Sequence, residues 1–389
     1  MLFYIQDGPM KNINFLIKPA SSFCNMRCSY CFYADEAANR SMADSGVMTH
    51  ETARTLLSET FSSIERGGSV SFAFQGGEPT MAGIGFFRDF TDLVRHYNTE
   101  NVHVSYSIQT NGYALDSVWA ELFKQEDFLV GISLDGTSEN HDRLRPDRGG
   151  HGTWERVSAN LQLLRSAGVE VNILCVVTKR LAKSPERTYA SLKKTGVGYL
   201  QFIACLDPLE KQRGMSAWSL TPEDYGGFLC GLFDVWYQDL MKGQYVSVRL
   251  FDDYVHLAMG LPPGTCSSSG SCGAYLVIES DGTIYPCDFY CLDEWKLGQL
   301  GHDSLEAVMY GPEHMRFLNG GQRRPEECGN CRYRSICRGG CRRDWIFDET
   351  GCHNYLCPAF RRFFDYAGGR ISQIARREME YARNAGFKK

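Results

Sequence analysis

The chain has 389 residues, of which 43% are hydrophobic and 22% are charged, and its net charge at pH 7 is −5. This composition predicts a globular protein with a sizeable core, and the length predicts two domains, because single cores rarely exceed about 250–300 residues. The negative charge gives no electrostatic basis for binding nucleic acid or an anionic membrane, and no signal peptide or membrane span is predicted, so we expect a cytoplasmic protein.

Short apolar strands alternate with amphipathic helices as far as residue 241, which is typical of a parallel sheet wrapped by helices. The predicted strands cover 12–18, 70–74, 102–108, 128–133, 169–177 and 198–204. The predicted helices cover 49–66, 83–97, 115–124, 153–166, 183–195 and 221–241. Six β/α units are fewer than the eight of a closed barrel, so we expect an α/β fold with an open, partial (β/α)6 TIM-like barrel.

The character of the sequence changes near residue 245, after which cysteines, glycines and short turns dominate. We therefore expect the partial barrel over 1–245 and a cysteine-rich domain over 246–366, in which bound metal replaces part of a hydrophobic core. The segment 367–389 is expected to be a C-terminal helix. The tail from Pro358 is predicted as one helix that Gly368 and Gly369 interrupt.

The sixteen cysteines are clustered along the chain. They fall at 24/28/31, at 266/272/287 and at 328/331/337/341/357, while the long middle of the chain holds few. So many cysteines could form a framework of disulfide bonds in a secreted protein. Clustered cysteines in a cytosolic chain indicate metal binding instead.

The first cluster, Cys24, Cys28 and Cys31, follows the first predicted strand and has the spacing CxxxCxxC. Three thiolates can hold three irons of a cubane cluster and leave the fourth iron open to a substrate or cofactor. A structural zinc site is the alternative, but it needs a fourth ligand, and none lies nearby. The triplet resembles the signature of radical S-adenosylmethionine enzymes.

Further motifs follow the next three predicted strands, at Gln75 to Pro79, Gln109 to Gly112 and Ser133 to Gly136. Because the carboxyl ends of parallel strands gather at one rim, these motifs are expected to lie beside the triplet. The Gly-Gly-Glu-Pro run could be an ordinary turn. After strand two, its glycines would let the backbone approach a ligand, and its carbonyls with Glu78 could receive the ammonium of S-adenosylmethionine.

Together with the stretch Gln201 to Leu209, these motifs resemble anaerobic sulfatase-maturating enzymes, over about residues 13 to 366. The triplet marks only the radical S-adenosylmethionine superfamily, whereas Leu206 to Leu209 and the later cysteines narrow the resemblance to this branch and its SPASM domain. The resemblance implies S-adenosyl-L-methionine and three 4Fe-4S clusters as cofactors.

The resemblance also divides the later cysteines between two auxiliary clusters. One would be held by Cys266, Cys272, Cys287 and Cys341, and the other by Cys328, Cys331, Cys337 and Cys357. Eight thiolates leave no open iron, which suits electron transfer. Two zinc ribbons are the alternative, and Cys352 could compete with Cys357 as a ligand.

The remaining functional residues are implied by the same resemblance. Asp288, directly after Cys287, matches the general base of the family. The contacts to S-adenosylmethionine are matched by Tyr30, Gly77, Ser133, Arg145 and Leu206, and those to the peptide by Tyr33 and Gln75. As isolated residues, most of these would more often be surface or packing groups.

The implied reaction is the oxygen-independent oxidation of a Cys or Ser in an unfolded sulfatase polypeptide to Cα-formylglycine. A flavodoxin- or ferredoxin-type protein would supply low-potential electrons. One alternative is a SPASM peptide maturase that forms thioether or carbon–carbon cross-links, although the 23 residues before Cys24 are expected to be too few for the leader-binding domain that such enzymes often carry. Another is a non-catalytic iron–sulfur electron carrier, which would need neither the open triplet nor the Gly-Gly-Glu-Pro turn.

Overall fold

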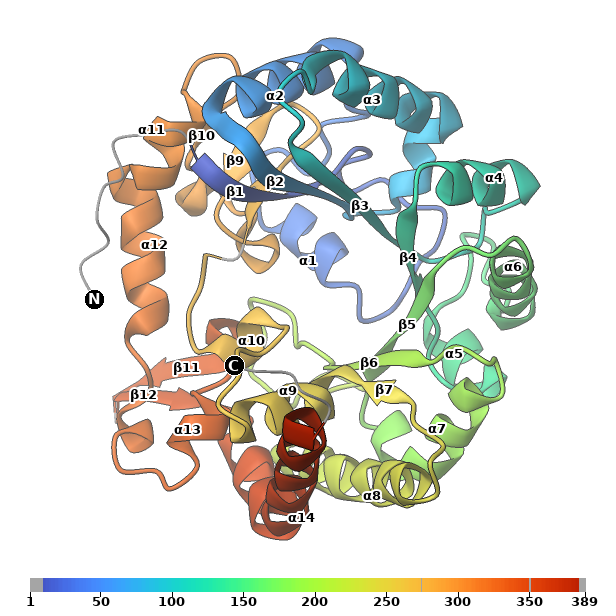
Figure 1. Ribbon diagram of the computed structural model, residues 1–389, viewed down its shortest axis with the longest axis vertical. Helices are drawn as coiled ribbons and strands as arrows, with labels where there is room; N and C mark the ends of the chain where they lie inside the picture. The colour runs from blue at the N-terminus through green and yellow to red at the C-terminus, as the bar shows by residue number, and fades with distance from the viewer. Residues whose placement is uncertain (1–9, 274, 350, 385–389) are drawn as a thin grey trace.

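The computed structural model describes residues 10–273, 275–349 and 351–384. A curved ten-stranded sheet, in the order β10-β9-β8-β1-β2-β3-β4-β5-β6-β7, forms an open barrel with helices on its outer face (Figure 1). The barrel strands, all parallel, are β1 (Met10–Ile17), β2 (Ile64–Phe74), β3 (His103–Thr110), β4 (Phe128–Ser133), β5 (Val171–Val177), β6 (Tyr199–Ala204) and the short β7 (Ser247–Val248). The predicted partial barrel is confirmed.

Eight α-helices accompany these strands. They are α1 (Phe32–Ala38), α2 (His50–Ser63), α3 (Gly83–Tyr97), α4 (Ser117–Gln125), α5 (Ser138–Leu144), α6 (Trp154–Ser166), α7 (Pro185–Lys193) and α8 (Pro222–Met241). The short helices α1 and α5 were not predicted. The predicted helix 49–66 ends early, at Ser63, because the chain from Ile64 already pairs with β1.

The two faces of the barrel sheet differ in character. On the outer face, Phe72 and Phe74 are buried against Phe87 and Phe90 of α3, and the rings of Phe74 and Phe87 lie 4.9 Å apart. On the inner face, small and polar side chains such as Ser71, Ser107 and Asn172 stay partly exposed. Leu174 and Val176 share this inner face with Asn172. The main apolar core lies between the sheet and the helices.

The cysteine-rich part shares the barrel's sheet. Its strand β8 (Leu276–Ile278) pairs parallel to β1, and β9 (Thr283–Tyr285) and β10 (Gly298–Gln299) continue the sheet antiparallel. Its helices are α9 (Arg249–Ala258), α10 (Cys266–Ser269), α11 (Leu305–Tyr310), α12 (Pro312–Gln322) and α13 (Arg334–Cys337), and β11 (Trp345–Asp348) with β12 (Gly351–Asn354) form a separate hairpin. The change in composition near residue 245 does not show that the barrel and the cysteine-rich part share one sheet.

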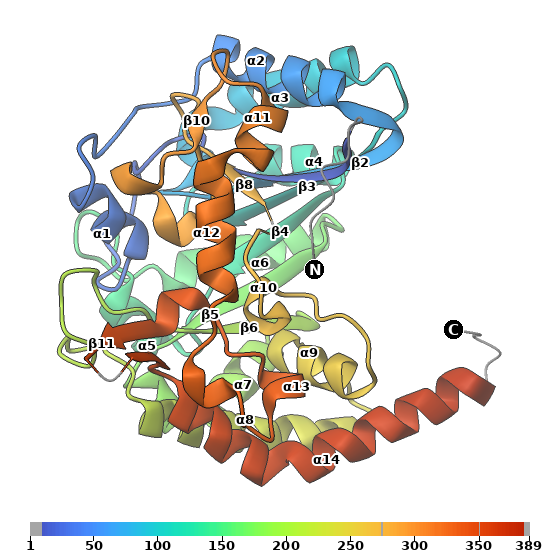
Figure 2. The same ribbon diagram turned by 90° about the vertical axis from the view of Figure 1, so that its left-hand side faces the viewer.

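The chain ends in one long helix, α14 (Cys357–Asn384), whose distal half projects from the body (Figure 2). It begins ten residues before the expected boundary at 367, and Gly368 and Gly369 do not interrupt it. Each glycine costs about 1 kcal/mol in a helix, but burial of Phe363, Ala367 and Ile371 offsets this cost. Residues 385–389 of the expected helix lie outside the described residues. Within the described chain, no helix is long and apolar enough to cross a membrane.

A buried ion cluster joins the barrel to the cysteine-rich part. The Nζ of Lys18, directly after β1, lies 3.2 Å from Oε2 of Glu279, which follows β8. Arg40 Nη1 lies 2.6 Å from the same oxygen. The three side chains are at most 3% exposed, so each charge depends on the others for compensation.

We predict that Glu279→Ala lowers the free energy of unfolding by about 3–5 kcal/mol, because it leaves Lys18 and Arg40 as buried, unpaired cations. Anaerobic urea unfolding followed by tryptophan fluorescence measures the change. The control is Glu51→Ala, which breaks the exposed pair with Arg54 and should leave the urea midpoint unchanged. Equal midpoints for both variants would contradict a structural role for the cluster.

Candidate active site

The cysteine triplet lines a cavity at the carboxyl end of β1. Cys24, Cys28 and Cys31 face about 1200 Å³ of empty space together with Gly77 and Arg148. The residues that line this cavity include no fourth cysteine and no histidine. This donor set fits an iron–sulfur cluster with one iron free of protein ligands, and it does not complete a structural zinc site.

The Gly76-Gly77 turn packs closely against the loop that carries Cys24, Cys28 and Cys31. Gly76 has φ +122°, and the Gly77 amide donates to the carbonyl of Ser21 at 2.9 Å. A Cβ at Gly77 would lie 2.3 Å from the Phe23 carbonyl oxygen, so no side chain fits there. The sequence motif is therefore a steric requirement of the loop that carries the cysteines.

Glu78 is buried, and its carboxylate bonds within the protein. It accepts hydrogen bonds from the hydroxyls of Thr80 and Thr110, at 2.7 and 2.6 Å, and from the amide of Asn111 at 2.7 Å. These bonds join the carboxyl ends of β2 and β3. These bonds fix the carboxylate before any ligand binds, and its contact with the ammonium of S-adenosylmethionine stays a prediction.

Tyr30 lies in a buried polar network with Asp135 and Arg145. Its hydroxyl donates to Asp135 Oδ2 and accepts from Arg145 Nη1 at 2.9 Å. Burial raises the pKa of the Cys28 thiol to about 11, and the opposing influence of the Arg145 cation favours the thiolate. The predicted Arg145 is thus a buried charge beside the triplet, and Asp135, which was not predicted as a site residue, is linked to it through the Tyr30 hydroxyl.

Ser133 and Arg145 are each held by a neighbour. Ser133 Oγ accepts from Gln109 Nε2 at 3.0 Å. The carbonyl of Arg145 accepts from the hydroxyl of Thr153, which also bonds the buried His141. These contacts fix two of the predicted cofactor-binding residues before any ligand binds.

Asp288 meets the two predicted peptide-contacting residues. Its Oδ2 accepts from the hydroxyl of Tyr33 at 2.7 Å and from Gln75 Nε2 at 3.4 Å. Its Oδ1 is buried and has no partner among the described residues. Burial raises the pKa of Asp288 to about 6, although Lys18 opposes the shift. Three segments far apart in sequence thus meet at one buried carboxyl group.

A second buried carboxyl lies near this group. Glu36 of α1 is 3% exposed, and burial, followed by the charge of Asp288, raises its pKa to about 8. The Lys18 ammonium lies 5.3 Å from the centre of the Tyr33 ring. Sequence reasoning missed Glu36 and Lys18, although a lysine that ends the apolar run Phe15-Leu16-Ile17 is a signal of a buried charge.

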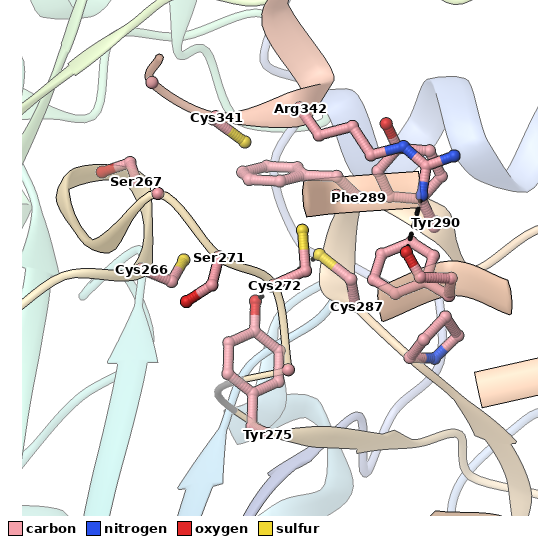
Figure 3. A pocket seen from close by; sticks show the side chains of 16 residues that line it. Cys266, Ser267, Ser271, Cys272, Tyr275, Cys287, Phe289, Tyr290, Cys341 and Arg342 are labelled. Carbon is pink, nitrogen blue, oxygen red and sulfur yellow. Dashed lines mark hydrogen bonds between the residues drawn. The ribbon is translucent and has the colours of Figure 1, made fainter. Parts of the chain in front are cut away.

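Four later cysteines from three segments line a second cavity. Their side chains, those of Cys266, Cys272, Cys287 and Cys341, surround about 530 Å³ of empty space (Figure 3). The hydroxyl of Tyr275 lies 3.9 Å from Cys287 Sγ. Cys287 lines this cavity. The next residue in the chain, Asp288, therefore directly follows a cavity-lining cysteine.

A third cavity, of about 400 Å³, is lined by the other four predicted ligands, Cys328, Cys331, Cys337 and Cys357. Cys352, on β12, does not line it. Within the described chain, no three Cys, His, Asp or Glu side chains converge enough to share a single metal ion. Four cysteines line each of the two later cavities, which is the number that closes a 4Fe-4S cluster to outside ligands.

Leu206 does not line the triplet cavity. It lines a different cavity, between β6 and the cysteine-rich part, together with Cys266 and Cys341. The loop that carries it is tied to α1, because the amide of Leu209 donates to Asp35 Oδ2 at 2.8 Å.

Two protein-family models match separate parts of the chain. The Radical SAM superfamily model matches residues 19–192, and the SPASM model, an iron-sulfur cluster-binding domain, matches residues 271–332. A solved structure, native anSMEcpe with bound AdoMet and Cp18Cys peptide, superposes with a TM-score of 0.89 at 38% identity, covering 94% of this chain and 99% of that one.

Two curated relatives cover nearly the whole chain. The cysteine-type anaerobic sulfatase-maturating enzyme of Clostridium novyi (strain NT) is 41% identical over 94% of this chain and 98% of its own length. The serine-type enzyme of Klebsiella pneumoniae is 29% identical over 90% of this chain and 86% of its own. The chain belongs to the family of anaerobic sulfatase-maturating enzymes, with a radical S-adenosylmethionine domain and an iron–sulfur cluster-binding SPASM domain.

Proposed function

We propose that this enzyme oxidises a cysteine of an unfolded sulfatase polypeptide to Cα-formylglycine without oxygen, with S-adenosyl-L-methionine and three 4Fe-4S clusters as cofactors. The observation that carries the proposal is the meeting of Asp288, Tyr33 and Gln75 at one buried point. Cysteine is preferred to serine as the target because this chain is 41% identical to a cysteine-type enzyme but 29% identical to a serine-type one.

Each group has a place in this proposal. Cys24, Cys28 and Cys31 hold the cluster that binds S-adenosylmethionine, and the two later sets of four cysteines hold the auxiliary clusters. When bound, these groups would supply a 5′-deoxyadenosyl radical that removes a Cβ hydrogen, and a path for the substrate's second electron. Water would then hydrolyse the resulting thioaldehyde, supplying the aldehyde oxygen and releasing sulfide.

Side chains of this protein accept the thiol proton of the substrate and position the cofactor. The unpartnered Oδ1 of Asp288 accepts the thiol proton of the target cysteine, while Tyr33 and Gln75 hold the other oxygen in place. Tyr30, Ser133, Arg145 and the backbone at Gly77 orient S-adenosylmethionine, and Leu206 approaches it from the loop after β6. Burial of the site keeps water from reactive intermediates.

The proposal includes two further features. A flavodoxin- or ferredoxin-type protein supplies low-potential electrons, and the enzyme acts in the cytoplasm, where thiols stay reduced.

We predict that Asp288→Asn lowers formylglycine formation by about 10²–10⁴-fold, because the amide cannot accept the proton. Mass spectrometry of a cysteine-containing sulfatase peptide under anaerobic, reducing conditions measures the product. Glu294→Gln, an exposed substitution in the same segment, is the control and should retain full activity. Undiminished product with Asp288→Asn would remove Asp288 from the mechanism.

Paired peptides that differ only in cysteine or serine at the target position test the chemistry and the preference. We expect faster turnover of the cysteine peptide and a product that has lost sulfur. A cross-linking maturase would instead give a product that keeps its sulfur and loses two hydrogens. Faster turnover of the serine peptide would overturn the cysteine assignment.

Metal analysis tests the auxiliary sites. We expect about twelve irons in the anaerobically reconstituted chain and about eight after Cys328→Ala with Cys331→Ala, because one 4Fe-4S cluster is lost. Cys230→Ala, which alters a half-buried thiol outside the three cysteine-lined cavities, is the control and should keep the iron content unchanged. About four irons in the parent chain, with zinc making up the difference, would contradict the three-cluster assignment.

A further inference from the structure

Cys266 differs from the other cysteines in its exposure to solvent. It is the only exposed cysteine of the described chain, which includes all sixteen. It lies on a loop of its own at one side of the second cysteine-lined cavity (Figure 3). A ligand on an exposed loop needs an anchor, because fixing the backbone of a loop costs about 1–2 kcal/mol of conformational entropy per residue.

The two residues before Cys266 are bound by one carboxylate. Two prolines precede Gly264, and because proline has no amide proton, Gly264 carries the first backbone donor after them. This amide donates to Oδ1 of Asp253 at 2.6 Å, and the hydroxyl of Thr265 donates to Oδ2. Both oxygens of Asp253 therefore hold the loop immediately before the ligand.

Asp253 lies on α9 and is only 2% exposed. Within the described chain, the hydrogen bonds that its carboxylate accepts all come from the loop before Cys266. A buried carboxylate is costly unless such bonds compensate for the lost water. The carboxylate and the loop therefore stabilise each other.

Further contacts hold the loop around this point. Oγ of the buried Ser268 lies 3.0 Å from Oγ1 of Thr265, and Arg249 Nη2 donates to the carbonyl of Gly264 at 2.8 Å. Helix α9 also contacts α13, which ends at Cys337 and thus carries a residue of the third cavity (Figure 2). One helix therefore supports cysteine-bearing segments of both later cavities.

We propose that Asp253 is a positioning residue, whose buried carboxylate holds Cys266 in place as a cluster ligand and whose negative charge lowers the reduction potential of that cluster. This inference rests on the proposed function, because it requires an iron–sulfur cluster in the cavity that Cys266 lines. Nearby charge and hydrogen bonds set the potential of such a cluster, since a negative charge disfavours an added electron. Asp253 acts through Gly264 and Thr265, at one residue's remove from the ligand.

Iron analysis of the anaerobically reconstituted enzyme tests the anchor. Asp253→Leu should lower the iron content from about twelve to about eight per chain, because one 4Fe-4S cluster loses a ligand. The matched control is Asp252→Leu, at the preceding residue of α9, whose carboxylate accepts from the hydroxyls of Tyr245 and Ser247 and should keep about twelve irons. Equal iron content in the parent and Asp253→Leu would overturn the inference.

The reduction potential is a readout that a purely structural role would not change. Asp253→Asn removes the charge but keeps an oxygen that can accept from the Gly264 amide, so the cluster should remain bound. An anaerobic redox titration followed by electron paramagnetic resonance should show one auxiliary cluster with a more positive potential. Asp252→Asn is the control and should shift no potential. An unchanged potential in Asp253→Asn would contradict the proposal.

Thr265→Val tests the contact without altering α9. It removes the hydroxyl that donates to Asp253, and a chelator should then extract iron about tenfold faster. Because Thr265 acts through Asp253, the double variant with Asp253→Asn should lose iron no faster than the faster of the single variants. Additive effects of the two substitutions would count against the inference.

The parent enzyme and its variants together separate this inference from the proposed function. Variants that match a parent with about twelve irons and normal formylglycine formation would overturn the inference and leave the proposed function standing. If Asp253→Leu loses its cluster, we expect it still to cleave S-adenosylmethionine and to release more 5′-deoxyadenosine than formylglycine. The expected iron loss and potential shift in an enzyme that forms no formylglycine would support the inference and contradict the proposed function.

Discussion

The site depends on the parallel pairing of β1 with β8. The buried ion pair between Lys18 and Glu279 lies beside this pairing and joins the ends of the two strands. The cysteine triplet follows β1, and Asp288 follows the hairpin of β8 and β9. Because one sheet carries both segments, their loops are held beside each other without a flexible domain interface. The hydrogen bond from Tyr33 to Asp288 then joins the two loops directly.

Charge is distributed so that each buried ionisable group has a neighbour. Arg145 lies beside Cys28 and donates to the hydroxyl of Tyr30, which in turn donates to Asp135, and Lys18 lies near Asp288 and Glu36. Burial alone would keep the cysteines as neutral thiols, which bind iron poorly. The Arg145 cation beside the triplet favours the thiolate form of Cys28. The same cation can also pair with the carboxylate of a ligand.

The strands and most helices were predictable, because hydrophobic periodicity and turn residues report local structure. The convergence of Tyr33, Gln75 and Asp288 was not, since more than 200 residues separate Gln75 from Asp288, and only the family resemblance brought them together. Local propensity also misled in one place. Gly368 and Gly369 continue a helix because tertiary packing outweighs their propensity.

An incomplete barrel has a physical advantage for an enzyme whose substrate is a polypeptide. A closed barrel fills its interior with its own side chains and satisfies every strand edge, so it offers a chain neither space nor backbone partners. Here small and polar side chains such as Ser71, Ser107 and Asn172 stay partly exposed on the inner face of the sheet. A bound polypeptide would fill this open interior and form the wall that excludes water from its own oxidation.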